Sequence, residues 1–168
     1  MPLDKSRLFD FLETLDEEIN KEITVVAVGG TAMTLLDLKT STIDIDFTIP
    51  SGDIPEFKAA LDSLQPGYKV DLWPDGCVFS QILPDDYLGR SSKVKDFKRI
   101  HLRVLHPVDI VVTKIGRLED RDIQDIEACI RKFKISKIEI EERAADVHYV
   151  GKDENYIENL KYVLWKFY

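Results

Sequence analysis

The sequence predicts an α/β (α+β) fold: a mixed sheet of about five strands flanked by helices, with a helical C-terminal portion. Short β-branched runs alternate with helical patterns up to residue 105, and only helical patterns follow from residue 108. At 168 residues, the chain has the length of one domain. We therefore expect a single domain over residues 1–168, with its core at about 23–130 and C-terminal helices at about 136–168.

The N-terminal elements begin with an amphipathic helix and lead to a glycine turn. Residues 4–20 repeat apolar side chains at helical spacing, at Leu8, Leu12, Leu15 and Ile19. Residues 23–28 are a short apolar run that predicts a strand ending at Gly29-Gly30, and residues 31–38 predict a helix that opens from this turn.

Strict alternation in residues 42–49 predicts the next strand. One face carries Ile43, Ile45, Phe47 and Ile49, and the other carries Thr42, Asp44, Asp46 and Thr48. Residues 54–64 then place apolar side chains at helical spacing, which predicts a helix.

The remaining strands of the sheet are expected before residue 106. Residues 68–73 and 77–83, separated by a turn with proline and glycine, predict two hairpin strands that both join the sheet. Residues 84–98 are polar and irregular, and residues 100–105 alternate as a further short strand. Helices are expected over about residues 108–118, 120–133, 136–148 and 153–167.

The composition is that of a globular protein with a hydrophobic core. Hydrophobic residues make up 44% and charged residues 32% of the chain, which excludes disorder as the main state. The formal net charge is −8, yet residues 90–143 hold 14 basic and 10 acidic residues. Two interpretations of this stretch stay open: it binds a polyanion such as RNA or a nucleotide, or its charges lie on ordinary solvated helix faces.

Several classes of protein find no support in the sequence. No signal peptide is visible and no apolar run approaches about 18 residues, so we expect a cytoplasmic protein without membrane contact. Cys77 and Cys129 lie far apart without metal-binding spacing, which indicates reduced thiols. A Walker loop, a dinucleotide fingerprint and a serine elbow are all missing from the sequence, and its histidines share no metal-ligand spacing.

Asp44 and Asp46 give the strongest local chemical signal. Residues two apart on a strand project to the same side, which brings both carboxylates within reach of one cation. Mg²⁺ prefers such oxygen ligands and relieves the repulsion between them. The alternation alone also fits a strand with a solvent-exposed polar face, so the context has to decide.

That context is the turn Gly29-Gly30-Thr31, at the junction of a strand and a helix. Glycines let the backbone approach a ligand closely, and free amides at a helix N-terminus favour a phosphate, to which the Thr31 hydroxyl could also donate. A tight turn with Thr31 as an ordinary helix cap explains the same residues without a ligand.

Taken together, these motifs resemble the polymerase-β-like nucleotidyltransferase superfamily, whose signature is a Gly-Gly or Gly-Ser turn followed by Asp-x-Asp. The matching residues are Gly29-Gly30-Thr31-Ala32-Met33, then Lys39, Thr42 and Asp44-Ile45-Asp46. The resemblance is strongest to minimal nucleotidyltransferases related to AbiEii-type toxins of toxin–antitoxin systems, and it covers roughly residues 23–130. It implies the nucleotidyltransferase fold, a nucleoside triphosphate bound at Gly29, Gly30 and Thr31, and Mg²⁺ or Mn²⁺ held by Asp44 and Asp46.

The resemblance extends to further charged residues. The superfamily often has a third carboxylate on a neighbouring strand, and Asp71 matches it, although ordinary strand alternation also explains this residue. In the AbiEii-like branch a helix lysine meets the phosphates and a basic-Asp-x-x-Asp stretch follows; Lys114 and residues 121–126 match these. The alternatives are a lysine that snorkels to the surface and a pair between Arg121 and Asp125 that only supports a helix.

The activity that the resemblance implies is transfer of a nucleoside monophosphate from a triphosphate to a hydroxyl acceptor. The implied catalytic residues are Asp44, Asp46, Asp71 and Lys114, and Lys114 also binds the nucleotide. The acceptor stays open among tRNA, a protein and a small molecule such as an antibiotic.

An alternative is a non-catalytic, nucleotide-binding or antitoxin-like module of the same fold. Minimal members of the superfamily often work beside a helical partner protein. Trp165 and Tyr168, at the end of the last predicted helix, fit either core packing or such a partner contact.

Overall fold

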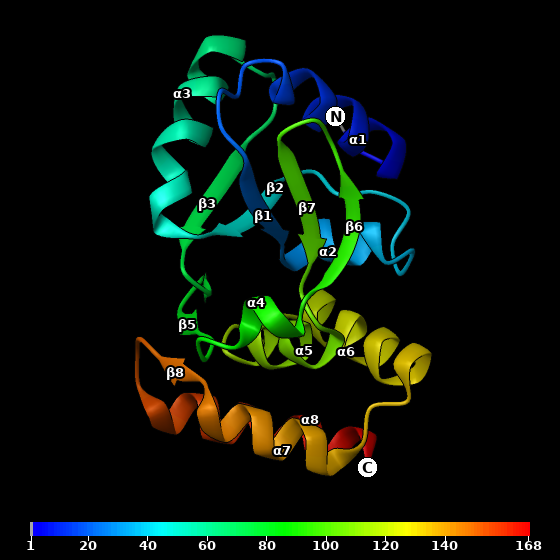
Figure 1. Cartoon of the computed structure of the whole chain (residues 1–168). Helices are drawn as coiled ribbons and strands as arrows, with labels where there is room; N and C mark the ends of the chain where they lie inside the picture. The colour runs from blue at the N-terminus through cyan, green and yellow to red at the C-terminus, as the bar shows by residue number, and fades with distance from the viewer. Residues whose placement is uncertain (1) are drawn as a thin grey trace.

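Five short strands form a mixed sheet in the order β3-β2-β1-β7-β6 (Figure 1). The structure is a computed structural model that describes residues 2–168. The strands are β1 (Ile23–Ala27), β2 (Ile45–Ile49), β3 (Val70–Pro74), β6 (Ser92–Asp96) and β7 (Ile100–Val104). β1 runs parallel to β7 and antiparallel to β2, while β2 runs parallel to β3, so the predicted mixed five-stranded sheet is confirmed.

The helices lie at both ends of the sheet in Figure 1. α1 (Lys5–Asp16) and α3 (Ile54–Leu64) lie at the end of the sheet where β1 begins. The short α2 (Gly29–Leu35) contacts β2 and the helix α5, at the opposite end of β1. The C-terminal portion consists of α5 (Pro107–Ile115), α6 (Asp120–Phe133), α7 (Lys137–Asp146) and α8 (Asp153–Phe167). The helical C-terminal portion is therefore confirmed.

A buried ion pair joins the C-terminal helices to one another. Asp109, at the start of α5, is fully buried and accepts two hydrogen bonds from the guanidinium of Arg143 on α7. The hydroxyl of Tyr156 on α8 donates to the carbonyl of Val112 at 2.8 Å. Both α7 and α8 are thus fixed on α5, which also contacts α2 and α6.

A second, small sheet corrects one prediction. Residues 77–83 do not join the main sheet; they turn back at Phe79-Ser80 into β4 (Cys77–Val78) and β5 (Gln81–Ile82). β5 then pairs with β8 (His148–Tyr149), which explains why the predicted helix 136–148 ends at residue 146.

The stretch 84–98, expected to be irregular, contains α4 (Tyr87–Arg90) and the edge strand β6. β6 carries one apolar residue, Val94, among polar ones, because an edge strand has little apolar surface to bury. The alternation in its sequence is therefore too weak to reveal a strand.

The strand expected over residues 42–49 begins only at Ile45. Ile43, expected on the same strand face as Ile45, is 69% exposed, whereas Ile45 is buried. The backbone of Thr42 pairs instead with that of Leu3 in an isolated bridge, with N–O distances of 2.7 and 2.9 Å, and the chain bends before β2 starts. The alternation in this segment describes a strand only from Ile45 onward.

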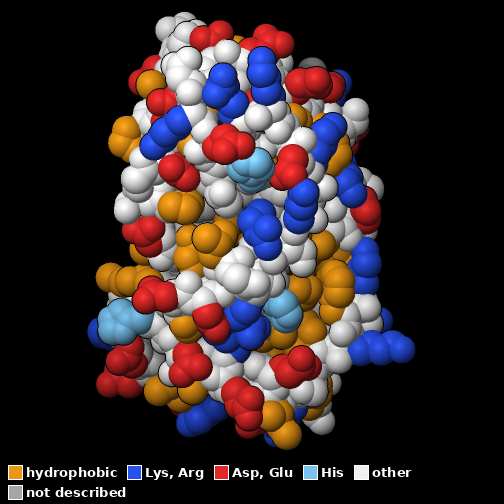
Figure 2. Space-filling view, in the orientation of Figure 1, with side chains coloured by type: hydrophobic (Ala, Val, Ile, Leu, Met, Phe, Trp, Pro, Cys, Tyr) orange, Lys and Arg blue, Asp and Glu red, His pale blue; other side chains and the backbone are white. Residues whose placement is uncertain are grey.

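Charges of both signs are interspersed over the face that Figure 2 shows. Lys93 on β6 forms an ion pair with Asp96, and His101 on β7 lies between Asp96 and Glu22. Within the stretch 90–143, Lys93 and His101 therefore have acidic partners. Among residues 2–168, no helix is both long and apolar enough to cross a membrane.

Candidate active site

Asp46 and Asp71 lie directly opposite each other on the parallel strands β2 and β3. Side chains at paired positions point to the same face of a sheet, so the two carboxylates are neighbours, as the sequence predicted. Asp44 lies just before β2 and completes the acidic group. The Asp46 side chain is nearly buried, with 6% of the residue exposed, whereas Asp71 and Asp44 are partly open.

The pKa of Asp46 reflects this crowding. Burial raises it from 3.8 to about 6, and the negative charges of Asp71 and Asp44 act in the same direction. The cations of Lys114 and Lys69 oppose the rise. A cation placed between the carboxylates would compensate both the lost hydration and the mutual repulsion.

The glycine turn packs directly against Asp46. Gly29 has a φ of +54°, a conformation that L side chains rarely adopt, and a Cβ on it would lie 3.2 Å from Asp46 Oδ2. A Cβ on Gly30 would lie 2.9 Å from Thr42 Oγ1, closer than real Cβ atoms come. Both glycines are therefore required by the close approach of the start of α2 to the acidic strand.

Thr31 holds the acidic segment in place. Its hydroxyl accepts a hydrogen bond from the Asp46 amide at 2.9 Å and donates to the Asp44 carbonyl at 3.3 Å. Thr42 donates to the same carbonyl at 2.8 Å. The Thr31 side chain is buried and both of its hydrogen bonds go to backbone, so this hydroxyl positions the aspartates instead of facing a phosphate.

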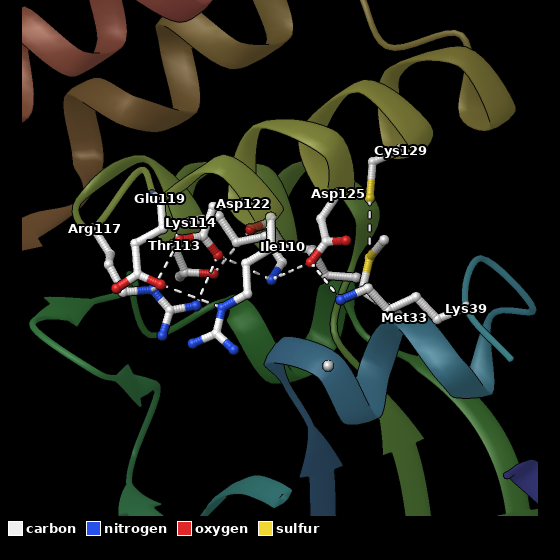
Figure 3. Close-up of polar contacts among 12 residues, drawn as sticks. Met33, Lys39, Ile110, Thr113, Lys114, Arg117, Glu119, Asp122, Asp125 and Cys129 are labelled. Atoms are coloured by element: carbon white, nitrogen blue, oxygen red, sulfur yellow. Dashed lines mark hydrogen bonds and ion pairs between the residues drawn. The ribbon is translucent and has the colours of Figure 1, made fainter. Parts of the chain in front are cut away.

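Lys114 on α5 acts on Asp46 through its charge, and its ammonium group is directed toward Asp122 and Asp125 of α6 (Figure 3). Its Nζ lies 2.9 Å from Asp125 Oδ2 and 3.5 Å from Asp122 Oδ1, both on α6. Lys39, after α2, reaches the same Asp125 oxygen at 3.0 Å. Lys114 is 5% exposed, so it is a buried lysine and not one that snorkels to the surface.

Arg117 is fixed by a two-pronged contact with Asp122, at 2.8 Å for both hydrogen bonds. Burial would raise the pKa of Asp122, but the hydrogen bond from Arg117 and the charge of Lys114 outweigh it and lower the pKa. Arg121 pairs with Glu119 at 3.3 Å. Asp125 pairs with Lys114 and Lys39, and not with Arg121 as the helix-supporting alternative expected.

These groups surround one cavity of about 380 Å³. Its charged and polar lining is Lys39, Ser41, Thr42, Asp44, Asp46, Lys69, Asp71, Lys114, Arg117, Arg121 and Asp125, and Gly29, Gly30, Ile43 and Phe79 complete it. The predicted site residues therefore come together here, with Thr31 just behind the wall.

The acidic group offers carboxylate oxygens, which are the ligands that hard divalent cations such as Mg²⁺ and Mn²⁺ take. Within residues 2–168, no three acidic, histidine or cysteine side chains close into a metal-binding group. Mg²⁺ usually keeps several waters and takes one or two carboxylates plus phosphate oxygens of a substrate. The open acidic group facing a basic wall is suited to that mode of binding.

The positions of two residues in the site, Asp125 and Phe79, depend on tertiary packing and not on a local sequence pattern. Asp125 belongs to a recognised stretch, but its contact with Lys39 depends on how α6 crosses α2, which no local pattern encodes. Phe79 lay inside a predicted strand and gave no signal.

The cysteines contribute no chemistry to the cavity wall. Cys129 lies 3.6 Å from the Met33 sulfur in the core (Figure 3), and burial raises the pKa of its thiol to about 12. A thiol in that state is inert. Cys77 and Cys129 are both free, as predicted.

Similar solved structures share the fold at low sequence identity. The crystal structure of ANT(2″)-Ia in complex with adenylyl-2″-tobramycin is 15% identical, with a TM-score of 0.57, covering 83% of this chain and 94% of that one. The solution structure of the antibiotic-resistance factor ANT(2″)-Ia is 14% identical, with a TM-score of 0.57, covering 85% and 91%. The chain therefore shares its fold with ANT(2″)-Ia.

Sequence comparison gives the family directly. No curated protein matches the chain significantly. The model of one family, described as nucleotidyltransferase of unknown function (DUF6036), matches residues 6–168. The chain therefore belongs to this family and is a nucleotidyltransferase, an enzyme that transfers nucleotidyl groups.

Proposed function

We propose that the protein transfers a nucleoside monophosphate from a nucleoside triphosphate to a hydroxyl acceptor, with Mg²⁺ or Mn²⁺ as the metal. One observation carries the proposal: the paired carboxylates of Asp46 and Asp71 line one cavity with Lys114 and with the Gly29-Gly30 turn, which packs against Asp46. Groups suited to bind phosphate and groups suited to bind a metal would therefore be neighbours in one site.

Asp44, Asp46 and Asp71 would hold the metal. When bound, the ion would supply charge stabilisation to the phosphoryl oxygens. The raised pKa of Asp46 supports this assignment, because a carboxylate that is costly to ionise alone gains most from a cation.

The phosphates would lie over the glycine turn. Gly29, Gly30 and Thr31 are the first three residues of α2, whose backbone amides have no acceptor within the helix and would donate to phosphate oxygens. Because the turn packs against Asp46, phosphates bound there would lie beside the acidic group. Lys114 and Arg117 face the same space and would balance the charge that develops as pyrophosphate departs.

In the transfer, the acceptor oxygen forms a bond to the α-phosphorus while the bond from that phosphorus to pyrophosphate breaks. The proton of the acceptor hydroxyl passes to a carboxylate, a role that we assign to Asp71. This aspartate is partly exposed to the cavity, whereas Asp46 is nearly buried. Lys69, whose Nζ lies 3.3 Å from Asp71 Oδ2, would hold that carboxylate in position for the acceptor hydroxyl.

The acceptor class is the target of the experiment. The ANT(2″)-Ia crystal structure contains an adenylylated aminoglycoside, which makes a small-molecule hydroxyl one candidate beside tRNA and protein. The protein would be incubated with each α-labelled nucleoside triphosphate and Mg²⁺ or Mn²⁺, together with total tRNA, cell-extract protein or an aminoglycoside panel. Label in one pool, lost with Asp46→Ala and kept with Gly52→Ala at an open surface position, supports the proposal. Absence of label and of metal-dependent nucleotide binding would refute it.

A partner-binding module without turnover is the second candidate. Its support is the exposed end of α8, where Trp165 is 77% exposed and its ring lies 6.0 Å from that of Tyr162. Nucleotide binding without transfer to any pool, in the presence of a bound helical partner, would favour this alternative.

A further inference from the structure

Phe79 stands out at the edge of the cavity. It has a φ of +54°, a region that is costly for a bulky side chain, and it keeps 39% of its surface exposed. It follows β4 at the tip of the small sheet, where Val150 N donates to the neighbouring Ser80 carbonyl at 2.8 Å. The chain thus maintains an unfavourable backbone conformation that presents an aromatic ring to the cavity.

The ring is braced by two partners. The Trp73 ring lies 4.9 Å away, tilted by 58°, at the end of the strand that carries Asp71. The guanidinium carbon of Arg117 lies 5.0 Å from the centre of the Phe79 ring. Since Arg117 is itself tied to Asp122 by two hydrogen bonds, ring and guanidinium form a preorganised surface.

The Phe79 ring also lies close to Asp46 and to the glycine turn. The position of a Cβ on Gly29 lies 3.8 Å from Phe79 Cε2 and 3.2 Å from Asp46 Oδ2, so ring, glycine turn and carboxylate meet at one point. Among the described residues that line the cavity, Phe79 is the only one with an aromatic side chain, and most of the others are polar or charged.

We propose that the Phe79 ring, with the Arg117 guanidinium over it, is the surface against which the base of the nucleoside triphosphate packs. This inference rests on the proposed function, which places the phosphates over the glycine turn. The base of a triphosphate bound there lies one ribose away from the α-phosphate, and an aromatic ring or an arginine plane offers the flat surface that a base requires. Because every base has such a face, the contact strengthens binding of all four nucleotides.

The test compares a full nucleotide with its phosphates alone. Affinities for ATP and for inorganic tripolyphosphate, both with Mg²⁺, are measured by calorimetry for the wild type, Phe79→Gly and Phe79→Tyr. Glycine accepts a φ of +54°, so Phe79→Gly removes the ring without straining the backbone, and its melting temperature reports an intact fold. Phe133→Leu is the matched control, since Phe133 is 37% exposed on α6 and does not line the cavity.

Phe79→Gly is expected to weaken ATP binding by roughly 5- to 100-fold while leaving tripolyphosphate binding unchanged. Phe79→Tyr should restore ATP affinity, and Phe133→Leu should alter neither. Equal ATP affinity of Phe79→Gly and wild type would overturn the inference and leave the proposed function standing. A parallel loss for ATP and tripolyphosphate would also overturn it, since the ring would then only support the site. A wild type that binds neither ligand would refute the proposed function and this inference with it.

The acceptor provides the last arm of the test. With labelled transfer established, Phe79→Gly should raise the KM for the nucleoside triphosphate and leave the KM for the acceptor as it was. A rise confined to the acceptor KM would assign the ring to the acceptor and overturn the inference.

Discussion

Asp46 and Asp71 occupy paired positions of two parallel strands, so the register of β2 on β3 brings two like charges together beneath the glycine turn. A sheet gains nothing from such a pair, because like charges directly opposite each other destabilise it. The arrangement therefore costs folding free energy in the absence of a cation, and the first prediction measures that cost.

Asp46→Asn should stabilise the metal-free protein at pH 8. The folded-state pKa of about 6 lies above the value of 3.8 for a free aspartate, so ionisation favours the unfolded chain. The contribution of Asp46 to stability is highest below pH 3.8 and falls by about 3 kcal/mol as the pH rises through 6. Urea denaturation with EDTA should show the variant more stable than wild type at pH 8, and the gap should shrink near pH 4. A variant equally stable or less stable at pH 8 would contradict the cause assigned to the pKa shift.

Asp125→Ala should destabilise the fold and impair nucleotide binding. It leaves the buried Lys114 with Asp122 alone at 3.5 Å, and breaking a buried pair costs about 3–5 kcal/mol. Glu127→Ala on the same helix, which removes an exposed pair with Arg131, should cost less than about 1 kcal/mol. Urea denaturation and the nucleotide KM check both variants, and similar losses for the two would show that the buried contact has no special role.

Gly29→Ala should lose activity through its neighbour Asp46. A φ of +54° costs alanine about 1–2 kcal/mol, and the added Cβ presses on the carboxylate. Gly89→Ala in α4, where a Cβ would meet nothing within 4 Å, should instead leave activity unchanged and stabilise by about 0.5–1 kcal/mol. Thermal melts and transfer rates give the comparison, and full activity of Gly29→Ala would argue against the close packing of turn and carboxylate.

Arg143→Met should loosen the C-terminal helices. It leaves the fully buried Asp109 with only Arg90 at 3.6 Å, at a cost of about 3–5 kcal/mol. Combining it with Asp109→Leu removes the stranded charge and should recover most of that loss. If denaturation midpoints show the double variant to be as unstable as the single one, packing and not the buried charge is responsible.

Much of this architecture follows from local pattern. The helix at 54–64 and the last helix at 153–167 coincide with α3 and α8, because each combines helical spacing with clear boundary residues. The edge strand β6 and the reversal at Phe79 escape such reasoning, since one has too little apolar alternation and the other depends on an unusual φ. Contacts between distant parts of the chain determine both the strand β6 and the reversal at Phe79.

The residues of the site also fall into two groups: those that local motifs indicate and those that only the tertiary structure brings together. The acidic strand and the glycine turn are short local motifs, so the sequence alone indicates them. The contact from Asp125 to Lys39 and the place of Phe79 beside Gly29 join segments far apart in the chain. Only the packing of α6 and of the small sheet brings these residues to the cavity.

The bridge between Leu3 and Thr42 extends the site to the start of the described chain. The Thr42 hydroxyl also donates a hydrogen bond to the Asp44 carbonyl. A displacement of the N-terminal segment would therefore move an aspartate of the acidic group through the hydrogen bonds that link Leu3 to Thr42 and Thr42 to Asp44. Trimming residues 2–4, or attaching a bulky tag beside them, would therefore disturb catalysis from a distance.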